Sequence, residues 1–474
     1  MSAYCGRLAM NSVRSLTLTV GQHNNAKRHL FPGDGLEAAV VLVCRRVGME
    51  SERLIVRKVI AVPYEDCSVR TEDRLTWPGS AIEDAMDIAE DHGDCVILLH
   101  SHPGGFFGFS EIDDLSDNTT MPCLYSAIPG PSAIHGSAIM TPNGAVLARV
   151  YPGVGQECVF LRTMVVGHDI KHYGRDIPSR ILHGTEGMRD LFGYLTVCVV
   201  GASGTGSIII EQLARNGIGH IILIDFDKAE WKNLNRILNC KVRHVETDAY
   251  KTELLAESIS EYAPSIRITC INRSIFDPAA IEAASSADTV FSCVDRQLGR
   301  SVCERISTAF IAPLVDLGVT IPTRTLPDGT VVVSDMCGRI DFVRPDGPNL
   351  SDRGVITPKG LYDEHIFLNA PDEAIEQVRN GYISGVAEEA PSVINVNMVA
   401  AARAYTEWTI RQLGGNLDPN ESVATIRFSL CARDEDHVAE ADYDHQTLLE
   451  LGQGFASPLL GFPALVSRKI GEAA

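Results

Sequence analysis

The chain has 474 residues, of which 45% are hydrophobic, and it carries a formal net charge of -20 at pH 7. At about 150 residues per domain, this length predicts two large domains or three ordinary ones. The acidic balance argues against nucleic-acid binding, because neutralising phosphates needs clustered Lys and Arg, and no run approaches the ~18 apolar residues of a membrane span. The first residues lack the apolar core of a secretory signal, and the 13 cysteines show no C-x-x-C spacing. We therefore expect a cytoplasmic protein without a disulfide framework.

Short apolar runs in the first part of the chain predict strands, with one helix over 82–92 and a return strand over 144–150. This pattern predicts an α+β domain over residues 1–155. The run Cys95–Leu99 is expected to be a buried strand. His100 and His102 follow it and, because side chains alternate along a strand, project from the same face.

An aspartate, Asp113, stands eleven positions after the second histidine. Two imidazoles and one carboxylate leave the fourth position of a tetrahedral zinc ion to water, which is the arrangement of a catalytic site. A structural interpretation also fits, with Ser110 as a helix N-cap, Asp113 in the first helical turn, and the two histidines merely polar.

Taken together, residues 100–103 and 110–113 give the pattern His-x-His-Pro-x6-Ser-x-x-Asp. This pattern resembles the signature of the JAMM (JAB/MPN) metalloproteases, with every spacing kept. The resemblance implies a zinc ion held by His100, His102 and Asp113, a general base at Glu37 just ahead of the strand-like run 38–43, and an oxyanion steadied by Ser110. Asp114 is an alternative ligand that only the spacing disfavours. The implied chemistry is hydrolysis.

The second part of the chain has a βαβ pattern. After a connector with a docking helix, expected between about 152 and 190, come a strand at Thr196–Val200, a glycine loop, a helix through Ala214 and a strand at Ile221–Asp225. Two more strands are expected over 266–270 and 289–293, and an alanine-rich helix over 392–413. We predict an α/β Rossmann-like domain with a mainly parallel sheet over residues 156–474.

The glycine loop lies between a strand and a helix, where backbone N–H groups favour phosphate. A dinucleotide fingerprint would require glycine at position 203, which is Ser203, although Asp225 ends the next strand as a ribose-binding acid would. An NAD-dependent dehydrogenase is therefore one alternative. The acids and cations that follow, including Lys251 and Asp295, argue against it, because nicotinamide chemistry needs no such set.

This set of residues resembles the ThiF/HesA/MoeB family of adenylating domains, relatives of ubiquitin-activating enzymes, over most of residues 170–435. The resemblance implies ATP and Mg²⁺ as cofactors. It assigns Gly201, Gly204 and Gly206 to ATP, Asp225 to the ribose, Asn233, Arg236 and Lys251 to the phosphates, Asp295 to magnesium, and Arg175 to the ATP site of a neighbouring subunit. A homodimer follows from the last assignment. Arg236 is also expected to act in catalysis, because a carboxylate that attacks the α-phosphate needs its charge neutralised. Taken alone, Lys251 or Arg175 would be read as a surface ion pair.

The chain departs from that family at several positions. Arg296 stands where an asparagine usually follows the magnesium-binding aspartate, and no charge that the chemistry needs is lost. Asn349 and Asp352 replace two cysteines of a Gly-Pro-Cys-x-x-Cys-like segment, which puts in doubt a cysteine-bound zinc and a thioester step there. Cys337 and Cys431 remain as alternative nucleophiles, although a buried structural cysteine is the commoner case.

The sequence thus predicts a bifunctional enzyme of a ubiquitin-like pathway. A zinc peptidase would cut at the C-terminus of a ubiquitin-like protein, and a second domain would adenylate such a C-terminus. The peptidase would either trim a precursor before activation or reverse a conjugation that the activator began, and the sequence does not choose between the two. The expected partners are a ubiquitin-like or sulfur-carrier protein with a C-terminal glycine and a conjugating-enzyme-like protein, with no membrane or nucleic acid. The alternatives are sulfur-carrier activation for cofactor or natural-product synthesis, and a non-catalytic binding module that keeps both folds.

Overall fold

The computed structural model describes residues 13–48, 52–128, 133–178, 183–370, 393–446 and 449–462. The chain forms two units: residues 1–179 with 451–455, and residues 180–450 with 456–474. The first unit thus extends past residue 155, the predicted end of the first domain. No helix in the described ranges is long and apolar enough to cross a membrane.

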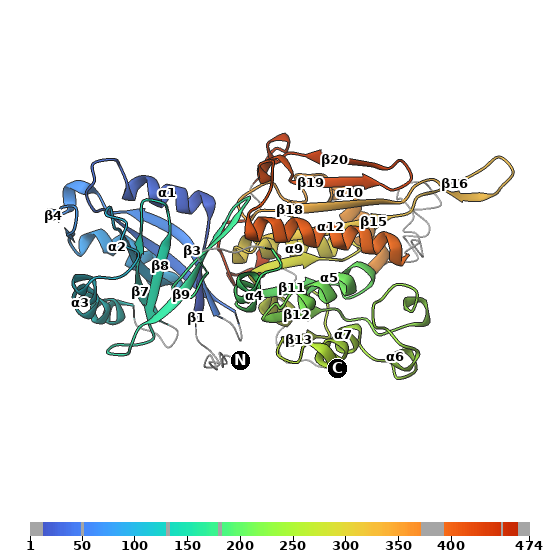
Figure 1. Cartoon of the computed structure of the whole chain (residues 1–474), viewed down its shortest axis with the longest axis horizontal. Coiled ribbons are helices and arrows are strands. Elements are labelled where there is room, and N and C mark those ends of the chain that lie inside the picture. Colours follow the sequence, from blue (N-terminus) through green and yellow to red (C-terminus); the bar gives the residue numbers. More distant parts are fainter. Residues whose placement is uncertain are drawn as a thin grey trace. The chain divides into compact units, whose positions relative to one another are not determined.

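The first unit is built on one mixed sheet flanked by three helices (Figure 1). Its elements are β1 (Val13–Thr19), α1 (Val20–Leu30), β2 (Ala39–Val47), β3 (Glu52–Ala61), β4 (Val69–Arg70), β5 (Leu75–Thr76), α2 (Ser80–His92), β6 (Cys95–Ser101), α3 (Glu111–Ala127), β7 (His135–Met140), β8 (Val146–Tyr151), β9 (Val159–Val166) and β10 (Ile170–Tyr173). The large sheet has the order β1-β3-β2-β6-β7-β8-β9-β10, and a further pairing of β1 with β9 closes it on itself. The predicted helix over 82–92 and the strands at 95–99 and 144–150 correspond to α2, β6 and β8.

The strands β2 and β6 are buried on both faces, which explains their unbroken apolar sequence. Alternate residues such as Leu42 and Ile97 enter one core cluster with α1, whereas their neighbours Val41 and Val96 enter a second cluster with α2 and α3. The sheet is therefore the middle layer between α1 and the α2–α3 pair. This position fixes the carboxyl end of β6, where His100 is the second-last residue and His102 directly follows the strand.

The predicted connector over 152–190 is wrong in its first part, because residues 159–173 form the two strands β9 and β10. β9 pairs with β8 and with β1, which lies more than 140 residues earlier in the chain. The expected helix follows them as α4 (Glu186–Gly193), whose Leu191 and Phe192 are buried.

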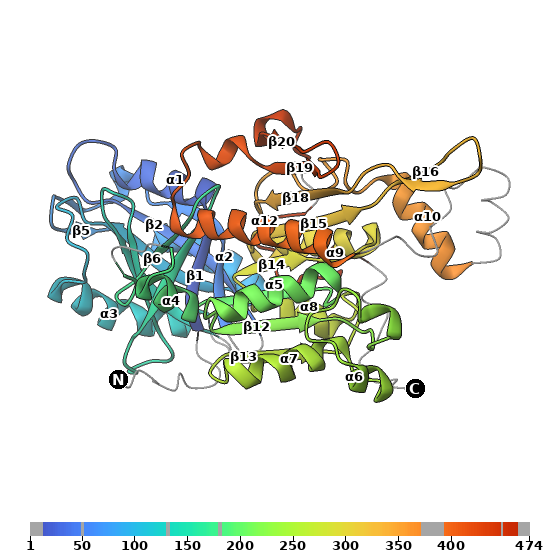
Figure 2. The same cartoon turned by 45° about the vertical axis from the view of Figure 1, so that its right-hand side comes forward.

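The second unit is a doubly wound α/β structure (Figure 2). Its elements after α4 are β11 (Thr196–Val200), α5 (Gly204–Arg215), β12 (His220–Ile224), α6 (Val242–Glu246), α7 (Lys251–Tyr262), β13 (Arg267–Ile271), α8 (Pro278–Ala284), β14 (Thr289–Ser292), α9 (Gln297–Phe310), β15 (Leu314–Thr320), β16 (Thr323–Thr325), β17 (Val331–Val333), β18 (Cys337–Val343), α10 (Pro358–Asn369), α12 (Ile394–Leu413), β19 (Thr425–Ser429) and β20 (Asp434–Val438).

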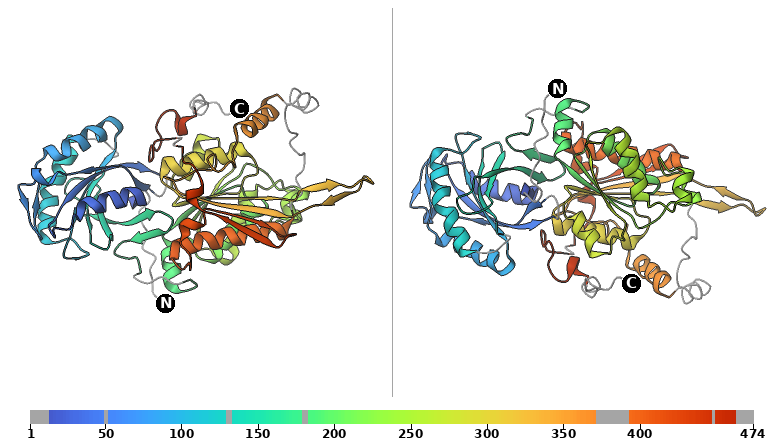
Figure 3. Two further views of the ribbon diagram at one scale, coloured as in Figure 1. Left: turned by 90° about the horizontal axis from the view of Figure 1, so that it is seen from above. Right: turned by 90° about the horizontal axis from the view of Figure 1, so that it is seen from below.

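The sheet of the second unit has the order β13-β12-β11-β14-β15-β18-β19-β20. The first five strands are parallel and the last three are added antiparallel. The sheet is thus Rossmann-type and its core is parallel, as predicted. The helix α12 packs on α5, and α9 covers the opposite face (Figure 3). The strand order reverses direction between β11 and β14, and ligands of such sheets bind at the carboxyl ends of the strands at that point.

Candidate functional site

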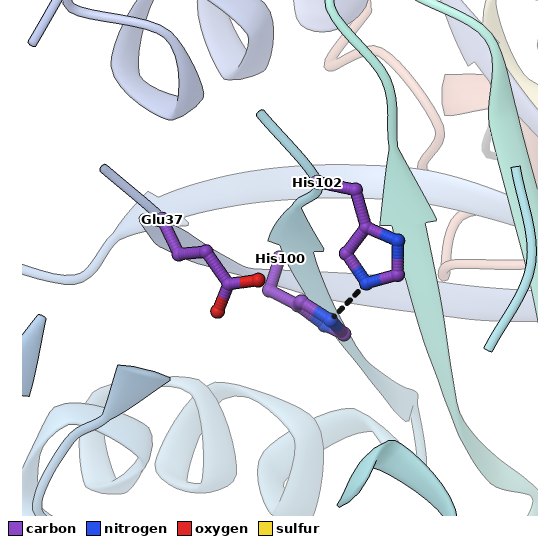
Figure 4. A group of neighbouring side chains, drawn as sticks. All are labelled: Glu37, His100 and His102. Atoms are coloured by element: carbon purple, nitrogen blue, oxygen red, sulfur yellow. Dashed lines mark hydrogen bonds between the residues drawn. The ribbon is translucent and has the colours of Figure 1, made fainter. Parts of the chain in front are cut away.

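The register of β2 and β6 brings Glu37 and the two histidines together. Ala39 of β2 pairs with His100 of β6, and the strands are antiparallel. Glu37, two residues before Ala39, therefore lies opposite His102, two residues after His100. Ligand atoms of Glu37, His100 and His102 all lie within 4.8 Å of one another, and Figure 4 shows their side chains converging. Sequence and register together thus explain the cluster.

Asp113 reaches the same cluster from the first turn of α3. Its Oδ1 lies 3.1 Å from His100 Nε2, and its Oδ2 lies 3.5 Å from His102 Nε2. Ser110 is the N-cap of α3: its Oγ accepts from the Asp113 N–H, and its own N–H donates to Asp113 Oδ2 at 2.6 Å. Burial would raise the pKa of Asp113, but the adjacent imidazoles of His100 and His102 outweigh burial and hold this pKa well below its ordinary value. Asp113 thus lies in the first turn of the helix and also beside the histidines, and its role as a metal ligand stays a prediction.

Asp114, the alternative ligand, points away from the cluster. Its Oδ1 lies 2.5 Å from Arg149 Nη1. Arg149 also donates to Asp117 Oδ2 at 2.7 Å, and this oxygen accepts a further hydrogen bond from Tyr151. These contacts join α3 to β8, which fixes the rotation of the helix and aims Asp113 at the histidines. The spacing argument that preferred Asp113 agrees with this geometry.

The cluster fits a zinc ion. Two nitrogens bound to one tetrahedral zinc at ~2.0–2.1 Å stand roughly 3.3 Å apart, and His100 Nε2 and His102 Nε2 are 3.0 Å apart. His102 Nδ1 donates to the Phe106 carbonyl at 2.9 Å, so its Nε2 lone pair is left for the metal. Burial raises the pKa of Glu37, although the two histidines oppose this. A carboxylate with a raised pKa suits a base that takes a proton near neutral pH.

The glycine loop of the second unit lies between β11 and α5, at the point where the strand order reverses. Gly201 has φ +92°, and a Cβ on it would stand 2.8 Å from the Cys293 carbonyl oxygen of the neighbouring β14 segment. A Cβ on Gly206 would stand 1.8 Å from the Gly201 carbonyl oxygen. Side chains are therefore excluded at both positions, and the chain turns tightly into α5, whose N-terminus is of the kind that favours phosphate.

Asp225 holds the glycine loop in place from the end of β12. Its Oδ2 accepts from the Ala202 N–H at 2.7 Å, and its Oδ1 accepts from the Asp227 N–H at 2.8 Å. Burial raises the pKa of Asp225, whereas Lys251 opposes that rise. Lys251 is itself buried at the start of α7 and lies 2.6 Å from Asp227 Oδ2. Asp225 thus bonds the loop directly, whereas Lys251 pairs with Asp227, and their predicted roles towards ATP stay predictions.

Arg236 and Asn397 both approach Gly204. A Cβ on Gly204 would stand 2.2 Å from Asn397 Nδ2 and 3.5 Å from Arg236 Cδ. The guanidinium of Arg236 donates to the Lys232 carbonyl at 2.6 Å. Asn397 was missed by sequence reasoning, because it lies on α12, nearly 200 residues after the loop. The sequence offered only one hint of this residue, namely a polar side chain inside an alanine-rich helix. In the structure Asn397 is buried in that helix.

The remaining predicted residues have different surroundings. Asn233 is buried, and its Oδ1 accepts from the Glu230 N–H at 3.0 Å, so it stabilises a turn. Asp295 follows β14 and is exposed, with its carbonyl accepting from Arg300 Nη1 at 3.3 Å. Arg175 belongs to the first unit, where its guanidinium lies 4.4 Å from the Phe160 ring centre. Its contact with a neighbouring subunit stays a prediction.

Residues 349–352 form a turn that is held by hydrogen bonds between Asn349 and Asp352, the two positions where the family has cysteines. Asn349 N–H donates to Asp352 Oδ2 at 2.9 Å, and Asp352 N–H donates to Asn349 Oδ1 at 3.0 Å. His445 Nδ1 lies 3.2 Å from Asp352 Oδ2. Of the alternative nucleophiles, Cys431 is exposed after β19. Burial and a hydrogen bond with Asp335 raise the pKa of Cys337 to about 11, which keeps its thiol protonated at neutral pH.

The same segment contacts a buried carboxyl group, Glu304 of α9, which predicts a pH-dependent stability. Ser351 donates to Glu304 through its N–H and its hydroxyl, at 3.1 and 2.8 Å. Burial raises the pKa of Glu304 from 4.5 to about 7. Between these values the folded chain holds a proton that the unfolded chain releases, so the free energy of unfolding falls as pH rises. At about 1.4 kcal/mol per pH unit, the loss is about 3 kcal/mol.

We expect Glu304→Gln to remove this loss, because an amide stays neutral at every pH and can hydrogen-bond Ser351. Denaturant unfolding of wild type and variant at pH 5 and pH 8 measures the effect. The exposed Glu282→Gln on α8 is the matched control and should keep the wild-type pH profile. Equal pH dependence in Glu304→Gln and wild type would contradict the assignment.

The parallel sheet, its glycine loop and Asp225 define the second unit as a Rossmann-type nucleotide-binding domain. Residues 173–343 match the model of the ThiF family. This part of the chain is therefore a ThiF-family domain, and the predicted resemblance is confirmed over that range. The resemblance of the first unit to JAMM metalloproteases stays a prediction.

The relatives of the chain match it in part. The ubiquitin-like modifier-activating enzyme 5 of Drosophila persimilis is 32% identical over 138 residues, which cover 27% of this chain and 34% of that enzyme. The adenylyltransferase and sulfurtransferase MOCS3 of Drosophila willistoni is 30% identical over 159 residues, 33% of each chain. A structure of E. coli MccB with MccA-N7isoASN gives a TM-score of 0.42 at 17% identity, covering 56% of this chain and 69% of that one. The chain spans about a third of the length of these curated relatives.

Proposed function

We propose that the second unit adenylates the C-terminal carboxylate of a ubiquitin-like or sulfur-carrier protein, and that the first unit is a zinc peptidase that cuts at such a C-terminus. The adenylation half is carried by the glycine loop fixed by Asp225 inside a ThiF-family domain. The peptidase half is carried by the convergence of Glu37, His100, His102 and Asp113. The two activities would share one substrate, a carrier that ends in glycine.

In the adenylation step, a carboxylate oxygen of the carrier attacks the α-phosphorus of ATP, the bond to the β-phosphate breaks, and pyrophosphate leaves. The N–H groups at Gly204 and Gly206 would bind phosphate oxygens, and Asp225 would bind the ribose once ATP enters. Arg236 and Lys251 supply the positive charge that the separating phosphates require. Asp295, exposed at the end of β14, would hold Mg²⁺, which neutralises charge on the leaving pyrophosphate.

In the hydrolytic step, Glu37 takes a proton from the attacking water and returns it to the leaving amine. Zinc held by His100, His102 and Asp113 would lower the pKa of water and polarise the scissile carbonyl. The Ser110 hydroxyl donates to Asp113 Oδ2 at 2.8 Å, so it must rotate away from Asp113 before it can donate to an oxyanion. Ser110 would thus exchange one hydrogen bond for another during the reaction.

The second candidate is sulfur-carrier activation for cofactor or natural-product synthesis, favoured by the likeness to a relative named as a sulfurtransferase. The absence of cysteines at Asn349 and Asp352 supports transfer of the adenylate to a thiol or amine of a partner, because amide and carboxylate side chains cannot form a thioester. For the adenylating enzyme we also propose a conjugating-enzyme-like partner, a homodimer and a cytoplasmic location.

The adenylation half is tested by ATP/pyrophosphate exchange with a panel of small carriers that end in Gly-Gly. We expect exchange that needs Mg²⁺ and one of these carriers, with no binding of NAD, because Ser203 breaks the dinucleotide pattern. A carrier whose last glycine is amidated is the matched control and should give no exchange. Tight NAD binding with no exchange across the panel would favour the dehydrogenase alternative and reject adenylation.

A further inference from the structure

Residues 103–109 lie in the loop between β6 and α3. One aromatic residue of this loop, Phe106, lies at the edge of the histidine cluster. The Phe106 ring lies parallel to the His102 imidazole within 15°, with the ring centres 6.1 Å apart. Despite this contact, Phe106 is 61% exposed. The loop carries no charged residue. An apolar surface therefore stands directly beside the residues that would perform hydrolysis.

Contacts of the loop backbone determine where this ring is attached. The Phe106 carbonyl accepts from His102 Nδ1 at 2.9 Å. On the other side, the ring packs over Gly108, where a Cβ would stand only 2.7 Å from the Phe106 Cζ atom. Gly105, with φ +80°, donates its N–H to the His102 carbonyl at 2.9 Å and closes the turn before the ring.

The end of the loop is anchored as well. The Phe109 ring lies 3.7 Å from the guanidinium carbon of Arg149, the residue that also binds Asp114 and Asp117 of α3. The loop is thus fixed between the histidine strand and the helix that carries Asp113. Because the backbone of the loop is already anchored, covering the exposed Phe106 ring orders little more than its own side chain, so the entropic cost of binding is low.

We propose that Phe106 determines specificity, by packing against a large apolar side chain of the substrate within two residues after the cleaved bond. This inference rests on the proposed peptidase function. The cleaved bond would lie at the proposed zinc ligands, and the Phe106 ring centre is 6.1 Å from that of His102. One residue of extended chain spans about 3.3–3.6 Å, so the two substrate residues after the cleaved bond can reach the ring. A carrier that ends in Gly-Gly has no side chain before the bond, so the contact falls on the extension that follows. The substrate is thus a linear precursor with an apolar start to its extension.

The experiment uses zinc-loaded full-length protein and Gly-Gly-ending ubiquitin-like carriers fused to an eight-residue extension. The first two residues of the extension are Leu or Phe in one set and Ser or Asp in the other. We expect wild type to prefer the apolar set by about tenfold in kcat/KM, the scale of a modest apolar contact. Phe106→Ala should reduce this preference to about twofold.

Two further variants separate the ring from its loop. Gly108→Ala keeps the ring but displaces it, because the new methyl group would overlap the phenyl group, and it should lose the preference like Phe106→Ala. Phe107→Ala removes the neighbouring ring, which is 40% exposed, and should keep the preference. Zinc content should be equal in all forms. In the hydrolysis-blocked Glu37→Gln background, fluorescence anisotropy should show weaker binding of the apolar fusion when Phe106→Ala is added.

Cleavage of both sets at equal rates, or a preference that survives Phe106→Ala and Gly108→Ala, would overturn this inference and leave the peptidase proposal standing. No cleavage of any fusion by any zinc-loaded form would reject the peptidase function, and this inference with it. Loss of preference in Phe107→Ala as well would show a general effect of loop disruption and also overturn the assignment to Phe106.

Discussion

Glu37→Gln is expected to keep zinc and to lower hydrolysis of a carrier fusion by about 10²–10⁴-fold, which is the usual contribution of a positioned general base. An amide has nearly the same size as the carboxylate but cannot take a proton from water. The carboxylate is buried and close to His100 and His102. Elemental analysis for zinc and cleavage kinetics together measure the two effects.

Two control variants make this result specific. His102→Ala removes a proposed ligand and should lose both zinc and hydrolysis. Asp114→Asn should keep both, because its amide oxygen can still accept from Arg149 and Asp117 continues to hold that arginine. Loss of zinc in Glu37→Gln would show that Glu37 is a ligand rather than a base. Wild-type cleavage by Glu37→Gln would reject both roles.

Asp295→Ala is expected to lower ATP/pyrophosphate exchange by about 10²–10³-fold, the scale of losing one group that stabilises charge in a transition state. Asp295 is exposed where β14 ends, close in sequence to the Cys293 carbonyl that faces Gly201. This carboxylate is the one that we propose to bind Mg²⁺ at the phosphates. The measurement is the exchange rate as a function of Mg²⁺ concentration, which should shift to higher concentrations in the variant.

The control for this prediction is Asp436→Ala on β20, where an exposed carboxylate of the same charge is removed away from the glycine loop. It should leave exchange unchanged. Exchange in Asp295→Ala within about threefold of wild type would mean that another carboxylate binds the metal. Equal losses in both variants would point to the overall negative charge of the unit instead.

Local apolar runs made much of the fold predictable. The strands β11, β12 and β14 lie within one residue of their predicted ranges, because each is a short buried run that ends at a turn. β9 and β10 were missed although β9 is itself an apolar run, because the polar residues around it made the whole segment look like a connector. The pairing of β1 with β9, which gives β9 its place in the sheet, is recorded by no local pattern. Long-range pairing is a property of the whole sheet.

The candidate sites show the same limit. The His100 and His102 pair was visible in the sequence because strand periodicity places both on one face. The choice between Asp113 and Asp114 depended on the rotation of α3, which Arg149 fixes from β8. Asn397 reaches Gly204 from α12, and the chain between them is too long for spacing to predict the contact.

The turn at Asn349–Asp352 has a practical consequence for how the two halves can be studied. Its side chains close on its own backbone and on His445, so it needs no metal to hold its shape. Within the part of the chain that the structure describes, a chelator that removes the proposed zinc and spares magnesium would then act on the histidine cluster. One reagent could silence hydrolysis in an intact polypeptide while activation continues, and adding zinc back at a chosen moment would reveal which event comes first on a shared carrier.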